Sequence, residues 1–103
     1  MPAIERTCPA DHPAAQGHFP GNPIIPGAVM LCEIIHAIGA SLGRDLILCR
    51  IKSAKFLYPA RPGDRLFIEF SEAPHGELRL TCSADGKQVL AANVECRVRW
   101  TAD

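Results

Sequence analysis

Hydrophobic and polar positions divide this chain into one helical stretch and a series of alternating runs. Residues 28–42 contain no proline, are rich in Leu, Ile, Ala and Met, and extend far enough to favour a helix over a strand. Apolar residues occur on every side of this helix, and Glu33 and His36 are its only strongly polar members, so we expect it to be buried. Gly39 and Gly43 indicate where it ends.

Short runs that alternate with a period of two follow the helix and predict strands. The expected strands are residues 47–57, 65–70, 77–82 and 89–100, with a shorter edge strand at residues 4–8. Asp85-Gly86 is the strongest hairpin signal in the chain. A helix followed by an antiparallel meander defines an α+β domain, in which we expect the helix to cross the concave side of the sheet.

The composition fits a single domain that spans residues 1–103, because 48% hydrophobic residues can build one core in a chain of this length. Eleven Lys and Arg balance eleven Asp and Glu, so no net charge favours nucleic acid or an anionic membrane as a partner. No apolar run approaches the ~20 residues that cross a bilayer, and the N-terminus lacks a signal-peptide core. We therefore expect a cytoplasmic protein, and zero net charge favours self-association.

The cysteines have the pattern of reduced thiols, since their number is odd and no CxxC pair occurs. They are Cys8, Cys32, Cys49, Cys82 and Cys96. We expect most of them to fill the core as small hydrophobic residues. The histidines and cysteines do not have the spacing of metal ligands, so no metal site is expected.

Residues 9–26 interrupt the pattern, because their prolines and glycines exclude a regular helix or a central strand. A loop of this length in a small domain is usually functional or disordered. His18 lies in it, and imidazole is the natural general base near neutral pH, although a surface histidine is the simpler interpretation. The loop ends in Pro26-Gly27 at the helix start, where free N–H groups can hold a carbonyl oxygen as it becomes an enolate.

The segment GHFPGNPIIPG at residues 17–27 resembles the signature of the beta-hydroxyacyl-ACP dehydratases of the FabZ and FabA type. The sequences KF at residues 55–56, PGD at 62–64 and DGK at 85–87 follow in the order of that family's strand and turn signals. The resemblance therefore covers nearly the whole chain. It implies a hot-dog fold, in which an antiparallel sheet wraps around one central helix.

The resemblance further implies a homodimer or higher homo-oligomer whose sheets join edge to edge, with two active sites at the interface. Acyl groups would arrive on the phosphopantetheine arm of acyl carrier protein, or on coenzyme A, with no further cofactor. In that family the motif histidine works with an acidic residue on the helix of the partner subunit, and His18 takes the first role. Phe19, Pro26 and Gly27 are expected to bind the substrate, with the Gly27 N–H polarising the thioester carbonyl.

The second catalytic group is where the chain departs from the family. The family's acidic residue lies five residues after the glycine, and this position is Cys32, while Glu33 is rotated from it by about 100°. His36 lies one turn after Cys32 on the same face. Three interpretations follow. A shifted helix register brings Glu33 in as the acid; Cys32 and His36 form a polar pair, with His36 as the acid or Cys32 as a nucleophile towards thioesters; or the second group is absent and Cys32 is a buried core thiol.

Together these residues predict a lyase of the (3R)-hydroxyacyl-ACP dehydratase type, in fatty-acid or related polyketide and polyene biosynthesis. His18 and Glu33 are the expected catalytic pair, and Cys32 and His36 are expected to contact the substrate. The alternatives are a catalytically weakened acyl-thioester-binding partner subunit and a hot-dog acyl thioesterase. A basic stretch is either a solvated strand face or a docking surface for the acidic carrier protein. It consists of Arg50, Lys52, Lys55, Arg61 and Arg65.

Overall fold

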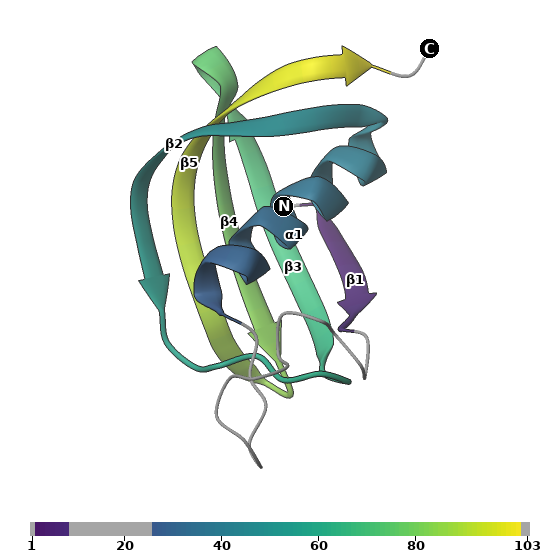
Figure 1. The fold of residues 1–103 in the computed structure, drawn as a ribbon, viewed down its shortest axis with the longest axis vertical. Helices are drawn as coiled ribbons and strands as arrows, with labels where there is room; N and C mark the ends of the chain where they lie inside the picture. Colours follow the sequence, from purple (N-terminus) through teal and green to yellow (C-terminus); the bar gives the residue numbers. More distant parts are fainter. Residues whose placement is uncertain (1, 9–25, 102–103) are drawn as a thin grey trace.

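One long helix, α1, crosses one face of a curved antiparallel sheet in the computed structural model (Figure 1). The structure describes residues 2–8 and 26–101. In chain order the elements are β1 (Ala3–Thr7), α1 (Gly27–Leu42), β2 (Arg44–Phe56), β3 (Arg65–Ala73), the 3-10 turn η2 (Pro74–Gly76), β4 (Glu77–Ala84) and β5 (Lys87–Thr101). Within this described part the strand order is β1-β3-β4-β5-β2, and all neighbouring pairs are antiparallel.

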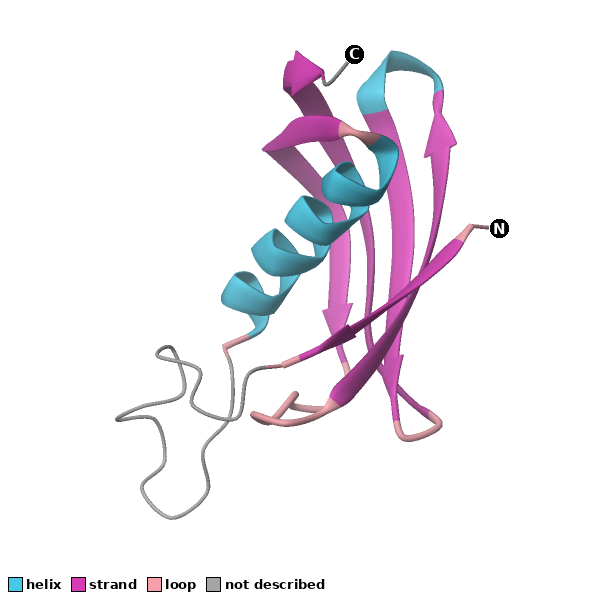
Figure 2. Cartoon of the chain, turned by 90° about the vertical axis from the view of Figure 1, so that its right-hand side faces the viewer, coloured by secondary structure: helices cyan, strands magenta, loops and turns pink. Residues whose placement is uncertain are grey.

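Alternation along β3 and β4 provides the floor of the core. Ile68 is paired with Cys82 and Phe70 with Leu80, and all four side chains are buried on the face that carries α1. Figure 2 shows the helix lying along this face of the sheet. The predicted α+β architecture, with the helix packed across the sheet and a short edge strand near the N-terminus, is confirmed.

The expectation of a helix buried on every side is wrong. The buried side of α1 consists of Met30, Leu31, Ile34, Ile35 and Ile38, together with Gly39. Cys32, Glu33, His36 and Ala40 are exposed on the opposite side. The reason is that one sheet can cover only one side of a helix, and the apolar residues on the other side are small. The exposed side of α1 is therefore available to a ligand or to another chain.

Two turns follow the geometry that their residues predict. Asp85 and Gly86 both have positive φ angles, 51° and 77°, as the two central residues of a tight hairpin turn require. Gly43 ends α1 in the left-handed conformation, with φ 70°, and its N–H donates a hydrogen bond to the Ala40 carbonyl at 3.2 Å. Each turn sets the register of the strand that follows it.

β1 and β2 form the two edges of the sheet. β2 starts earlier than predicted, directly after Gly43, and bends where its pairing with β5 shifts register, between Leu48 and Arg50 and between Ile51 and Ser53. The backbone of α1 lies closer to β2 than to β1. This unequal spacing leaves room for a groove between the helix and β1.

Candidate active site

A small cavity of about 250 Å³ opens at the N-terminus of α1. Pro26, Gly27 and Met30 form its helix side, and Val89 and Leu90 of β5 form part of its other wall. The segment from Phe56 to Ala60, which leaves the end of β2, completes the lining. We call it the N-terminal cavity.

Gly27 is required by its close contact with Phe56. A Cβ atom on Gly27 would lie 2.6 Å from Cδ1 of the Phe56 ring, which is closer than carbon atoms can approach. The Met30 N–H donates to the Pro26 carbonyl at 3.0 Å, and no described side chain caps the first turn. The amides before Met30 therefore keep donors that can hold an oxygen of a ligand.

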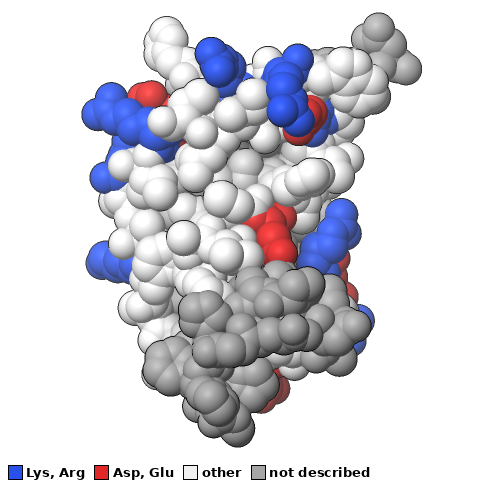
Figure 3. All heavy atoms as spheres, viewed as in Figure 1, with Lys and Arg blue, Asp and Glu red and all other residues white. Residues whose placement is uncertain are grey.

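A larger groove of about 430 Å³ runs between α1 and the sheet edge at β1. Its lining is mostly apolar, with polar side chains at its rim. The lining residues are Arg6, Thr7, Cys8, Met30, Cys32, Glu33, Ile34, His36, Ala37, Ala40, Leu66 and Ile68. We call it the β1 groove. Figure 3, which views this side of the molecule, shows that much of the surface is uncharged and that acidic and basic atoms adjoin near its centre.

Three predicted site residues, Cys32, Glu33 and His36, come together in the β1 groove. α1 is helical from Gly27 onward, so a shifted register is not what brings Glu33 there. The groove is instead wide enough to receive side chains from neighbouring helical positions. The interpretation of Cys32 as a buried core thiol is wrong, because its side chain is exposed.

Cys8 forms the buried end of the groove and is only 3% exposed. Burial raises the pKa of its thiol to about 11, and the negative charges of Asp64 and Glu33 contribute in the same direction. The Cys8 thiol therefore remains protonated at neutral pH. Its coupling to Glu33 indicates that the carboxylate of Glu33 lies close to the end of β1.

Three residues that line these cavities, Arg6, Cys8 and Phe56, were not among the predicted site residues. Arg6 is paired with the inward-facing Leu66, so it projects from β1 towards the helix side of the sheet. The sequence could have indicated this, because Ile4, Arg6 and Cys8 are alternate residues of a strand and therefore lie on the same face. In the sequence, Phe56 was noted only as part of the KF pair that resembles the family. The structure explains its presence, because its ring packs against Gly27.

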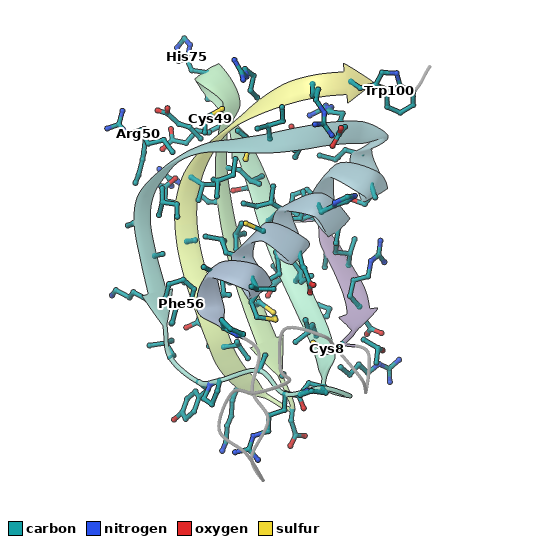
Figure 4. All side chains as sticks on the ribbon, in the orientation of Figure 1. Cys8, Cys49, Arg50, Phe56, His75 and Trp100 are labelled. Atoms are coloured by element: carbon teal, nitrogen blue, oxygen red, sulfur yellow. The ribbon has the colours of Figure 1, made fainter. Side chains whose placement is uncertain are left out.

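The two cavities lie on opposite sides of α1. Figure 4 shows Phe56 on β2 at one side of the helix start and Cys8 at the end of β1 at the other side. Met30, which is 1% exposed, is the residue that lines both. Within one chain, then, the described residues do not bring the Gly27 amide and the Glu33 carboxylate into one cavity. His18 and Phe19 lie outside the described residues, so their roles stay predictions.

The basic stretch does not form one free cationic surface. Lys52 lies 3.3 Å from Glu77 and 3.5 Å from Glu95, and Arg65 lies 3.0 Å from Glu5. These ion pairs compensate two of the five positive charges. Fewer uncompensated positive charges are therefore available to dock an acidic partner than the sequence indicated.

Metal and membrane sites can be assessed within residues 2–8 and 26–101. No three His, Cys, Asp or Glu residues in these ranges gather in a way that could hold a metal ion. No helix in the same ranges has the length and apolar character needed to cross a membrane.

Comparison with known proteins gives a consistent family. Residues 2–94 match the family model described as ApeI-like, ApeI dehydratase. The chain is 33% identical over 98 residues to the 3-hydroxyacyl-[acyl-carrier-protein] dehydratase FabZ of Novosphingobium aromaticivorans, with 84% of this chain and 60% of that protein covered. It is also 33% identical over 100 residues to FabZ of Thermus thermophilus, with 89% and 66% covered. The chain thus spans less than two thirds of the length of these relatives.

Solved structures with the same fold include a dehydratase and a thioesterase. The dehydratase heterocomplex ApeI:P from Xenorhabdus doucetiae matches with a TM-score of 0.77 and 20% identity, over 91% of this chain and 84% of that chain. A point mutant of the fluoroacetyl-CoA-specific thioesterase FlK matches with a TM-score of 0.70 and 12% identity, over 95% and 87%. These likenesses establish the predicted hot-dog fold.

Proposed function

The chain belongs to the ApeI-like dehydratase family, and from this premise we propose that it removes water from (3R)-3-hydroxyacyl thioesters. The observation that carries the proposal is the helix start, where Gly27, the last residue of the 17–27 motif, lies beside the Phe56 ring and the first amides of α1 are uncapped. The substrate would be carried on the phosphopantetheine of acyl carrier protein or on coenzyme A, in the cytoplasm, with no bound cofactor. Fatty-acid, polyketide or polyene biosynthesis would use such a step.

The elimination needs one base, one acid and one group that stabilises negative charge. In the proposed reaction His18 removes a proton from C2, and the Gly27 N–H stabilises the thioester carbonyl as it becomes an enolate. Glu33 then donates its proton to the C3 hydroxyl, which leaves as water. The product is the trans-2-enoyl thioester, and His18 and Glu33 exchange protons with solvent before the next cycle.

A homodimer would unite the two halves of this site. Because Gly27 and Glu33 face different cavities in one chain, we propose that each active site takes His18 and Gly27 from one chain and Glu33 from its partner. β2 supports this arrangement, since it is an edge strand with one unpaired side. Ile51, Val98 and Trp100 near this edge are large exposed apolar residues that a partner could cover.

The test is hydration of crotonyl-coenzyme A, which is the reverse reaction and is followed by the loss of enoyl absorbance. The wild-type chain is expected to catalyse it, and His18→Ala is expected to reduce kcat/KM by about 10²–10⁴-fold, the usual contribution of a general base. The exposed variant Cys49→Ala is the matched control and is expected to keep the wild-type rate. Absence of hydration by the wild type, also with an enoyl group on acyl carrier protein, would refute the proposal.

Cys32 favours a second candidate, a partner subunit that binds acyl thioesters and completes the site of an active dehydratase. This position carries a thiol where the family's acid is expected, and a similar fold occurs in the ApeI:P heterocomplex. A subunit of this kind would show no hydration alone and would raise the rate of an active family member with which it copurifies. Hydration of crotonyl-coenzyme A by the wild-type chain alone separates the two candidates.

A further inference from the structure

Cys32 and Cys8 both line the β1 groove, but Cys8 is buried and Cys32 is exposed. We infer that Cys32 accepts acyl groups from thioesters, with His36 as its base, and that the protein thereby hydrolyses acyl thioesters through a covalent intermediate. The inference rests on the proposed function only for its substrate class, an acyl thioester. It gives the exposed side of α1 an activity that does not require the elimination.

Burial excludes three of the five cysteines as nucleophiles. It raises the pKa of Cys8 and of Cys96 to about 11 and that of Cys82 to about 12. Since the thiolate is the reactive form, these side chains are inert at neutral pH. Cys32 and Cys49 are exposed.

Cys49 differs from Cys32 in its surroundings. It lies on β2 next to Arg50, away from the β1 groove (Figure 4), and its thiol is within 3.6 Å of the Ile47 carbonyl. Cys32 instead opens into the groove, and His36 follows one helical turn later and lines the same groove. Side chains at this spacing have Cβ atoms about 5–6 Å apart, so the imidazole can reach the thiol by rotation about its side-chain bonds. Nucleophilic catalysis by cysteine needs a base within hydrogen-bond reach of the thiol, and this rotation would bring His36 there.

The groove also has room for the acyl chain. Its volume of about 430 Å³ lies within the range of roughly 300–1,000 Å³ that is common for small-molecule sites. Met30, Leu66 and Ile68 provide buried apolar walls below the exposed thiol. An acyl chain would thus lie on the core while its thioester carbonyl meets Cys32 at the rim.

The reaction has two balanced steps. His36 takes the thiol proton, the Cys32 sulfur attacks the carbonyl carbon, and the bond to the carrier sulfur breaks as the carrier thiol receives that proton. The product is an S-acyl Cys32. A water molecule then attacks the same carbonyl, with its proton passing through His36 to the Cys32 sulfur as the carboxylic acid leaves.

Butyryl-coenzyme A is a suitable probe, because its saturated chain has no hydroxyl and cannot enter the elimination or hydration. Peptide mass spectrometry of the incubated wild-type chain is expected to find the butyryl group on Cys32, together with release of free coenzyme A. Cys32→Ala should abolish the release, and His36→Gln should slow acylation by about 10²-fold, the lower range for loss of a base. Cys49→Ala should change neither, and circular dichroism verifies that each variant is folded.

Three results would overturn the inference: no adduct on Cys32, labelling of Cys49 at the same rate as Cys32, or acylation of the His36→Gln variant at the wild-type rate. Crotonyl-coenzyme A hydration measured on the same preparation keeps the two proposals apart. Hydration without an adduct would remove this inference alone. An adduct without hydration, also with an enoyl group on acyl carrier protein, would support the inference and remove the dehydratase proposal.

Discussion

The N-terminal cavity and the β1 groove differ in whether backbone or side-chain groups shape them. The first is shaped by the backbone, because Gly27 lies against Phe56 and the amides of the first helical turn supply the polar contacts. The second is shaped by side chains, with Cys32, Glu33 and His36 along its helix wall. A backbone site tolerates few changes of sequence and keeps a readable motif. A side-chain site can be rebuilt by single substitutions, and it is here that the sequence differs from the pattern that the resemblance implies.

The largest expected effect tests whether the two regions act together across chains. Glu33→Gln keeps the size of the side chain but removes its proton donor, so hydration of crotonyl-coenzyme A should fall by about 10²–10⁴-fold, as it should for His18→Ala. An equal mixture of the two inactive variants, unfolded and refolded together, should recover about a quarter of the wild-type rate. Half of the dimers would then be mixed, and each mixed dimer has one intact site.

The readout of this experiment is the activity of the mixture relative to each variant refolded alone. Recovery of activity would show that His18 and Glu33 act from different chains. A mixture as inactive as its components, with dimers verified by analytical ultracentrifugation, would mean that both residues serve the same chain or that Glu33 acts elsewhere.

The next effect concerns the backbone site. Gly27→Ala introduces a Cβ atom 2.6 Å from the Phe56 ring, so the ring or the helix start must move. Displacement of about 1 Å at a reacting centre can reduce the rate by about 10²-fold, and overpacking costs about 1–3 kcal/mol of stability. Crotonyl-coenzyme A hydration and urea unfolding measure the two effects separately.

Gly63 offers a matched control for this substitution. A Cβ atom at this position would meet no described heavy atom within 4 Å, but the φ angle of 89° disfavours a side chain. Gly63→Ala should therefore cost stability through the backbone alone and leave the hydration rate of the remaining folded protein unchanged. If Gly27→Ala behaves in the same way, the contact with Phe56 has no role in the site.

The contrast also explains what the sequence could predict. The strands were visible because their inward residues alternate, and the hairpin was visible because Asp85-Gly86 has the residues that a tight turn requires. The helix start was visible through Pro26-Gly27. The exposed side of α1 was not, since Cys32 and Ala40 count as apolar in any pattern and only the position of the sheet decides which side is covered. The groove also depends on Arg6 and Cys8, which are remote in sequence from the helix.

The smallest expected effect tests the buried end of the groove. Burial raises the pKa of Cys8 from 9.0 to about 11, so the unfolded chain loses this proton at a lower pH than the folded chain. The contribution of the thiol to stability is therefore fully present below pH 9 and is lost as the pH rises towards 11. Between pH 8 and 10 this amounts to about 1 kcal/mol for one thiol. Cys8→Ala should remove this pH-dependent contribution from the free energy of unfolding measured in urea.

The comparison that isolates Cys8 is the difference in unfolding free energy between wild type and Cys8→Ala at each pH. Lysine, tyrosine and Cys96 titrate in both proteins, so their contributions cancel in this difference. Cys82 does not cancel completely, because the charge of Cys8 helps to raise its pKa, but burial is the larger cause. The lost packing of the sulfur appears as a constant offset, whereas ionisation makes the difference shrink by about 1 kcal/mol from pH 8 to pH 10. If the unfolding free energies of wild type and Cys8→Ala change in parallel with pH, the thiol is accessible to solvent. The β1 groove would then extend past Cys8 to the surface. In that case Cys8 would join Cys32 as a thiol that acyl thioesters can reach, and the difference between the inert and the reactive end of the groove would disappear.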